Sequence, residues 1–134
     1  MKKILLDTNF LLIPYQFNVD IFSQIDRIAD FKYELFVLDR SLEELRKIIN
    51  EQKGSDKDAA KIALKLIAIK GIKVVKANDF QSVDDAIVDA SSKGDFIVAT
   101  QDKELKKKLT QKGVPIIILR QKKKLEILSH NYIA

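Results

Sequence analysis

The stretch Lys3–Leu12 reads KILLDTNFLL and sets the expected fold, because a short apolar run ends on an acid. Residues 3–7 predict a buried strand, since uninterrupted apolar runs of this length are typical of strands covered on both faces. Thr8 and Asn9 follow directly. Parallel α/β sheets form their sites at the carboxyl ends of strands, so Asp7 is the first candidate site residue.

Apolar runs alternate with amphipathic segments along the rest of the chain. Four more strands are expected, at residues 34–38, 72–75, 96–100 and 114–119. Helical periodicity or capping residues separate them. Strands joined through helices predict right-handed βαβ units. We therefore expect a three-layer α/β domain, with a five-stranded parallel sheet and helices on both faces.

The core domain is expected over residues 1–120, in a chain of 134 residues with 46% hydrophobic residues. Residues 121–134 are basic and then apolar. We expect them to be a C-terminal tail, either a last helix packed on the domain or an arm that contacts a partner. Pro115 predicts that the start of the fifth strand lies near a sheet edge.

The composition restricts the possible chemistry. The chain has no cysteine, which excludes disulfides and thiolate zinc sites, and only one histidine, His130. A divalent metal would therefore need oxygen ligands, which favours Mg²⁺ or Mn²⁺. The net charge of +5 favours polyanionic partners such as RNA. No signal peptide or membrane span is recognisable, so the cytoplasm is the expected location.

Four acids lie where a parallel sheet places its site: Asp7, Glu44, Asp84 and Asp102. Each has a structural alternative. Asp7 can stabilise a turn, Glu44 can form a capping box with Ser41, Asp84 can face a helix dipole, and Asp102 can be an N-cap. These alternatives do not explain why all four fall at one end of the sheet. Crowded carboxylates repel one another unless a cation neutralises them, so the four are candidate metal ligands.

Helical geometry separates these acids from their neighbours. Glu44 lies beside the apolar stripe of its helix, whereas Glu43 points nearly opposite to it. The same count favours Asp84, and Asp85 stays as the alternative ligand. Bound Mg²⁺ or Mn²⁺ would lower the pKa of a water and orient a scissile phosphate. A second shell of hydrogen-bonding groups is expected from three residues, Thr8, Asn9 and Thr100.

Basic residues near the proposed pocket are candidates to hold RNA phosphates, although a solvated helix face is the alternative for each. They are Arg40, Lys47, Lys103, Lys106 and Lys107. Three aromatic residues follow the first strand: Phe10, Tyr15 and Phe17. They could stack on bases, but we expect them in the core, where aromatic residues more often lie.

Four segments in order resemble the successive motifs of PIN domains. They read ILLDTNFLL (4–12), LEEL (42–45), DDAI (84–87) and VATQD (98–102). The first, third and fourth look most like the archaeal and eukaryotic rRNA-processing branch of the family. VapC toxins share the four acids less closely. The resemblance extends from Lys3 to about Leu119.

The resemblance implies a Rossmann-like sheet with strand order 3-2-1-4-5 and an endoribonuclease that uses Mg²⁺ or Mn²⁺ to hydrolyse RNA phosphodiester bonds, with a possible place in rRNA processing. It carries four residues over as catalytic metal ligands: Asp7, Glu44, Asp84 and Asp102. The alternatives are a VapC-type toxin ribonuclease and a non-catalytic module that binds RNA or protein. A protein partner would be an antitoxin or a ribosome-assembly factor, and a homodimer is compatible with each reading.

Overall fold

The computed structural model describes residues 1–77 and 82–129. The end of the expected tail, with His130, lies outside these residues. The strands are β1 (Lys2–Leu6), β2 (Tyr33–Leu38), β3 (Lys73–Val75), β4 (Phe96–Ala99), β5 (Ile116–Arg120) and β6 (Lys124–Leu128). The helices are α1 (Thr8–Leu11), α2 (Ile13–Phe17), α3 (Ile21–Ile28), α4 (Asp39–Glu51), α5 (Ser55–Ile69), α6 (Val83–Ser92) and α7 (Lys103–Gln111).

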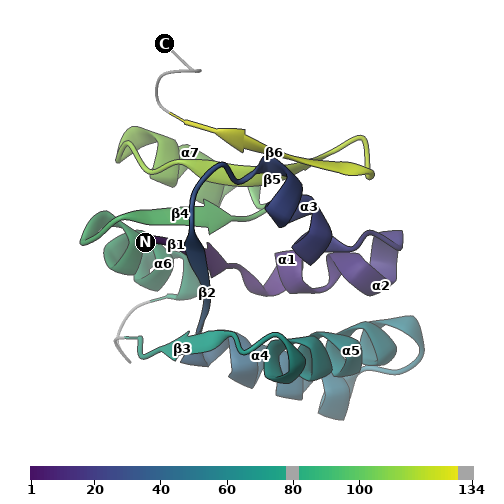
Figure 1. Ribbon diagram of the computed structural model, residues 1–134. Helices are drawn as coiled ribbons and strands as arrows, with labels where there is room; N and C mark the ends of the chain where they lie inside the picture. Colours follow the sequence, from purple (N-terminus) through teal and green to yellow (C-terminus); the bar gives the residue numbers. More distant parts are fainter. Residues whose placement is uncertain (78–81, 130–134) are drawn as a thin grey trace.

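The strands form one sheet in the order β3-β2-β1-β4-β5-β6, which runs from bottom to top in Figure 1. The first five strands pair in parallel, so the predicted order 3-2-1-4-5 is confirmed. β6 pairs antiparallel with β5 and was not predicted. The helix considered for the start of the tail is therefore wrong, and the edge expected at Pro115 is occupied by β6.

Helices cover both faces of the sheet, as predicted, because successive strand residues point to opposite faces. In β1, Ile4 and Leu6 belong to the core under α1–α5, whereas Leu5 belongs to the core under α6 and α7. In β4, Ile97 and Val98 divide in the same way. Both faces of the central strands are thus apolar, which explains their uninterrupted hydrophobic runs.

The chain leaves the two central strands toward opposite faces. After β1 it enters α1, whose Phe10 packs in the first core, and after β4 it enters α7, whose Leu105 packs in the second. The carboxyl ends of β1 and β4 are therefore not covered by a connection between them. Open parallel sheets form their ligand sites in this crevice.

Two local expectations are corrected by the structure. α4 begins at Asp39 instead of Ser41, its N-cap Leu38 makes no side-chain cap, and no capping box forms with Glu44. Asp39 Oδ1 instead accepts the backbone N–H groups of Arg40 (2.8 Å) and Ala77 (3.0 Å), which secures the ends of β2 and β3 to each other. Ser41 is consequently inside the helix and fully buried.

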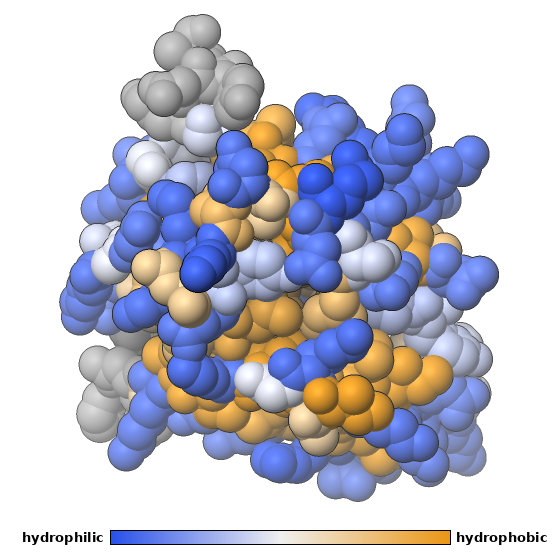
Figure 2. All heavy atoms as spheres, viewed as in Figure 1, coloured by the Kyte–Doolittle hydropathy of each residue, from blue (hydrophilic) through white to orange (hydrophobic). Residues whose placement is uncertain are grey.

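The aromatic residues after β1 divide between core and surface. Phe10 is fully buried, as expected, but Tyr15 and Phe17 on α2 are 40% and 38% exposed, so their assignment to the core is wrong. The view in Figure 2 also shows hydrophobic surface in its lower part, where Figure 1 places α5. Exposed apolar residues of α5 include Ile62 and Ile69.

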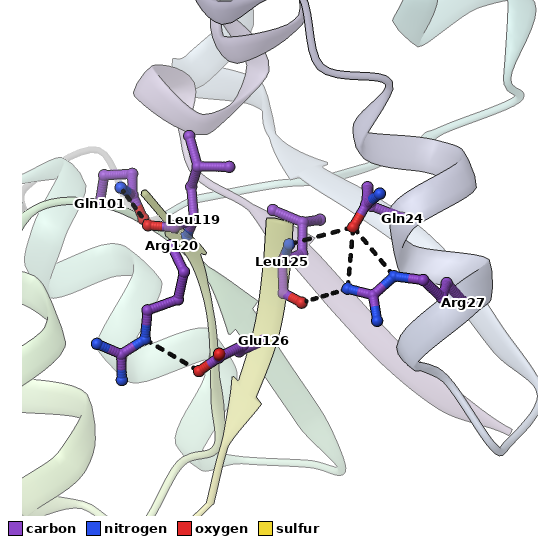
Figure 3. A network of polar contacts seen from close by, with 7 residues as sticks. All are labelled: Gln24, Arg27, Gln101, Leu119, Arg120, Leu125 and Glu126. Atoms are coloured by element: carbon purple, nitrogen blue, oxygen red, sulfur yellow. Dashed lines mark hydrogen bonds and ion pairs between the residues drawn. The ribbon is translucent and has the colours of Figure 1, made fainter. Parts of the chain in front are cut away.

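The edge strand β6 is held to α3 by side chains. Leu125 donates its N–H to Gln24 Oε1 (3.3 Å), and its carbonyl accepts Arg27 Nη2 (2.9 Å), as Figure 3 shows. Arg27 also donates to Gln24 Oε1, which keeps both side chains in place. These bonds satisfy backbone groups of Leu125, as natural proteins commonly protect an edge strand.

No helix in the described part of the chain is long and apolar enough to cross a bilayer.

Candidate active site

Asp7 lies at the carboxyl end of β1 and is only 6% exposed. Its Oδ1 accepts the N–H of Thr8 (2.8 Å), so it caps α1, and its Oδ2 accepts the hydroxyl of Thr100 (2.9 Å). The pKa of Asp7 is raised to about 6: burial raises it most, the two hydrogen bonds lower it, and the charges of Asp84 and Glu44 raise it. The carboxylate is therefore costly to ionise in this position.

Glu44 is joined to the end of β1 through Thr8. The buried Thr8 hydroxyl donates to Glu44 Oε1 (2.9 Å) and lies 2.8 Å from the hydroxyl of Ser41. Glu44 lies on the surface of α4, and Glu43 is also exposed. The predicted choice of Glu44 over Glu43 is thus supported by a contact with Thr8, the residue next to Asp7.

Asp102 is joined to Asp7 through Thr100. The Thr100 hydroxyl donates to Asp7 and accepts the N–H of Asp102 (3.1 Å). Asp102 is also the N-cap of α7, because its Oδ1 accepts the N–H of Leu105 (2.9 Å). The structural role considered for Asp102 is therefore real, and its second carboxylate oxygen is not needed for that cap.

Asp84 and Asp85 differ in their surroundings. Asp84 is half-buried, and burial followed by the charge of Asp102 raises its pKa, whereas Lys108 lowers it. Asp85 is exposed and forms an ion pair with Lys108 (3.6 Å), while its backbone N–H is accepted by Ser82. Asp84 is thus the member of the pair that faces the other acids.

The four acids influence one another without forming a closed cage. Across residues 1–77 and 82–129, no three acidic or histidine side chains are close enough to share one ion. Mg²⁺ keeps several waters and needs only one or two direct carboxylates, so the oxygen donors present fit such an ion. Burial is the largest cause of the raised pKa values of Asp7 and Asp84, and the charges of neighbouring acids add to both.

The three residues predicted to hydrogen-bond the acids differ in their surroundings. Thr8 and Thr100 are buried and hydrogen-bonded to the acids, as described above. Asn9 is exposed, and its backbone carbonyl accepts the N–H of Leu12 (3.2 Å).

Two positioning contacts were not predicted. Ser41 supports Thr8, and Gln101 exchanges two hydrogen bonds with the backbone of Leu119 (2.7 and 3.3 Å). Sequence patterns gave no signal for either.

The residues predicted to bind phosphate differ in exposure and in their surroundings. Arg40 is half-buried, and its Nη1 is buried without a hydrogen-bond partner in the described part of the chain. Lys47 is exposed and lines a cavity of about 250 Å³ together with Glu44. On α7, Lys103 and Lys107 are exposed and Lys106 is half-buried.

Comparison with known proteins connects this geometry to a family. The family described as "PIN like domain" matches residues 4–122. A protein named Ribonuclease VapC4 from Methanocaldococcus jannaschii is 35% identical over 130 residues, which cover 95% of this chain and 97% of that protein. Ribonuclease VapC9 from Archaeoglobus fulgidus is 32% identical over 120 residues, covering 89% and 84%.

A solved structure shares the fold at lower sequence similarity. It is described as the PIN domain endonuclease Utp24, and it superposes with a TM-score of 0.78 over 95% of this chain and 91% of its own. The sequence identity is 23%, so this likeness supports the fold.

Proposed function

The chain belongs to the PIN-like domain family, and on that premise we propose that it is a metal-dependent endoribonuclease that hydrolyses RNA phosphodiester bonds. Its proposed catalytic residues and metal ligands are Asp7, Glu44, Asp84 and Asp102. Of the pair on α6, Asp84 is preferred over Asp85. A role in ribosomal RNA processing and a cytoplasmic location stay predictions.

One observation carries the proposal: the charge of the buried Asp7 carboxylate is opposed by two other acids. Asp84 and Glu44 raise its pKa, and its hydrogen bonds come from neutral groups on Thr8 and Thr100. A carboxylate needed only to cap α1 would be more stable on the surface. A site that receives a divalent cation gives this arrangement a purpose.

Each residue has a distinct task in the proposed reaction. Mg²⁺ or Mn²⁺, when bound, would activate a water and neutralise charge on the scissile phosphate. Asp7 would supply the least mobile carboxylate, because both its oxygens are fixed by hydrogen bonds. Thr8 and Thr100 would keep Glu44 and Asp102 aligned with it. No side-chain nucleophile is required, which agrees with the absence of cysteine.

The direct test is cleavage of a labelled RNA by the wild type, Asp7→Asn and Asp95→Asn, with Mn²⁺, Mg²⁺ or EDTA. Asp95 is an exposed acid at the amino ends of the parallel strands, which we call the amino edge of the sheet, and it pairs with Lys2 (3.3 Å). We call the carboxyl ends of these strands, where the four acids lie, the carboxyl edge. Metal-dependent cleavage by the wild type and Asp95→Asn, lost in Asp7→Asn, is expected. Equal cleavage by all three proteins would remove the proposed mechanism.

A second candidate is a toxin ribonuclease of the VapC type, neutralised by a small protein partner. It is favoured by the near full-length similarity to the two proteins named VapC. Inducible expression should then arrest growth, and Asp7→Asn should abolish that arrest. Growth that is unaffected by the wild type at confirmed protein levels would reject the toxin reading while leaving a ribonuclease possible.

A further inference from the structure

The turn between β5 and β6 gathers basic side chains that the proposed reaction does not use. We call residues 120–124 the basic hairpin; it contains Arg120, Gln121, Lys122, Lys123 and Lys124. Figure 1 places it at the upper right, and the same region of Figure 2 is hydrophilic. Four cations in five residues repel one another, so a polyanion is the complementary partner.

The basic hairpin projects beyond the edge that carries the acids. Thr100 donates its N–H to the carbonyl of Ile117 (3.1 Å), so Ile117 is level with the end of β4. β5 continues to Arg120, three residues further. At about 3.3 Å per residue, the strand extends roughly 10 Å past the level of Thr100. A chain that crossed the acidic pocket could therefore continue along the basic hairpin.

Specific contacts fix the basic hairpin in this position. Gln101, next to Asp102, exchanges two hydrogen bonds with the backbone of Leu119, as Figure 3 shows. Lys123 N–H closes the turn onto the carbonyl of Arg120 (2.9 Å). Gln121 and Lys122 have φ values of 51° and 58°, a left-handed conformation that glycine adopts more easily than other residues. The turn thus retains a basic residue where glycine would cost less.

Most of these cations are available for a ligand. Arg120 pairs with Glu126 (2.9 Å), but no ion pair in the described part of the chain involves the three lysines that follow. Arg120, Lys123 and Lys124 line a cavity of about 280 Å³ with Gln121 and Glu126. This cavity offers several donors suited to phosphate oxygens.

The exposed ring of Phe17 on α2 lies near a cation of the basic hairpin, and Tyr15 on the same helix is also exposed. The ammonium of Lys122 is 5.9 Å from the ring centre of Phe17, so the end of the Lys122 side chain lies near α2. Phe17 and Tyr15 are both substantially exposed, although aromatic side chains are costly to leave in water. Cations beside available rings are the combination by which proteins hold unpaired nucleotides, with phosphates on the cations and bases on the rings.

We propose that the basic hairpin, together with Tyr15 and Phe17, binds a single-stranded segment of RNA that continues from the acidic pocket. The proposal rests on the proposed function, because it takes RNA to be the substrate. It favours an unpaired strand over a duplex, since paired bases cannot stack on these rings. An acidic protein would be held by the cations alone and would not need the rings.

The test compares charge reversals at opposite edges of the sheet. The hairpin variant is the double substitution Lys122→Glu/Lys123→Glu. The control is the double substitution Lys32→Glu/Lys112→Glu, which changes the net charge equally at exposed lysines of the amino edge. Binding of a fluorescent oligouridylate is measured by anisotropy in EDTA, over a range of salt concentrations. Circular dichroism confirms that each variant is folded.

The hairpin variant should bind at least about tenfold more weakly than the wild type, and the control within about twofold. Losing two phosphate contacts should reduce the slope of log affinity against log salt by about 1.4. Phe17→Leu should weaken binding by at least about fivefold at an unchanged salt slope, unlike Phe31→Leu at the amino edge. Equal binding by the hairpin variant and its control would overturn the proposal.

A second probe and an activity assay separate the remaining outcomes. If polyglutamate binds as well as the oligouridylate and Phe17→Leu changes neither affinity, the surface recognises acidic chains in general and the RNA assignment is wrong. If the hairpin variant and its control bind RNA equally while the wild type cleaves RNA with Mn²⁺, this proposal fails alone. If the hairpin variant and Phe17→Leu both lose affinity but no protein cleaves, the binding surface stands and the proposed function fails.

Discussion

Acidic side chains have opposite surroundings at the amino edge and at the carboxyl edge of the sheet. At the amino edge, Asp95 pairs with Lys2, and a hydrogen bond from Lys73 lowers the pKa of Glu34. At the carboxyl edge, Asp7 is buried near two other acids and its pKa is raised to about 6. One edge is arranged for stability, whereas the other retains a charge that opposes folding. This difference supports the proposed cation site at the carboxyl edge.

The largest expected effect is on catalysis. Asp7→Asn should lower the rate of metal-dependent RNA cleavage by on the order of 10³-fold or more, the scale seen when a catalytic group is removed. Asp95→Asn at the amino edge should stay within about twofold of the wild type. Single-turnover cleavage with Mn²⁺ measures both rates, and similar losses in both variants would erase the distinction between the edges.

The same substitution should stabilise the protein without metal. The folded-state pKa of Asp7 is about 6 and its ordinary value is 3.8. Between these values the folded state binds more protons than the unfolded state, so the free energy of unfolding falls as pH rises. Above pH 6 the loss of folding free energy caused by the ionised Asp7 approaches about 3 kcal/mol, at 1.36 kcal/mol per pKa unit.

Urea unfolding in EDTA at several pH values measures this cost. The stability gained by Asp7→Asn should be small near pH 4, grow toward pH 6 and then remain constant. Asp95→Asn is the control and should show no such growth. A gain for Asp7→Asn that does not change with pH would contradict the account of the buried carboxylate.

An intermediate effect is expected for the hydroxyl that joins two of the acids. Thr100→Val removes the donor to Asp7 and the acceptor for Asp102 N–H. Cleavage should fall by about 10- to 100-fold, with a higher metal concentration at half-maximal rate, as when groups that orient metal ligands are lost. Thr100→Ser keeps the hydroxyl and should recover most of the rate. Failure of serine to recover it would show that the methyl packing matters more.

The smallest effect is expected at the amino edge. Lys2→Met should change the free energy of unfolding by less than about 1 kcal/mol, because its partner Asp95 is exposed and such pairs contribute little. Cleavage should be unchanged. Urea unfolding at neutral pH makes the comparison with Asp7→Asn, and a larger loss would mean that this edge depends on its ion pairs more than its exposure suggests.

The parallel part of the fold was predictable because its signals are local. Apolar runs such as residues 3–7 and 96–100 identify central strands, and the helices between them require parallel pairing. The last strand was not predictable in the same way. The alternation of Lys124, Leu125 and Glu126 is short and lies in a basic segment. The backbone of Leu125 forms its hydrogen bonds with the side chains of Gln24 and Arg27, about a hundred residues earlier in the chain.

The proximity of the four acids was predictable, but the contacts that join them were not, and their assignment as metal ligands stays a prediction. Strand ends and helix starts indicated the four acids, and helical geometry distinguished Asp84 from Asp85. The sequence could not show that Ser41 supports Thr8, because the N-cap of α4 is Leu38, three residues before the N-cap that the capping pattern suggests. It also could not show that Phe17 meets Lys122, since that contact depends on the unpredicted turn between β5 and β6.

The most direct measurement is the titration of the Asp7 carboxyl by NMR, without and with Mg²⁺. We predict a midpoint near pH 6 for Asp7 without the ion and a clear decrease when Mg²⁺ is added. An Asp7 midpoint near the ordinary 3.8, or one that does not respond to Mg²⁺, would contradict the claim that this edge is arranged to receive a cation.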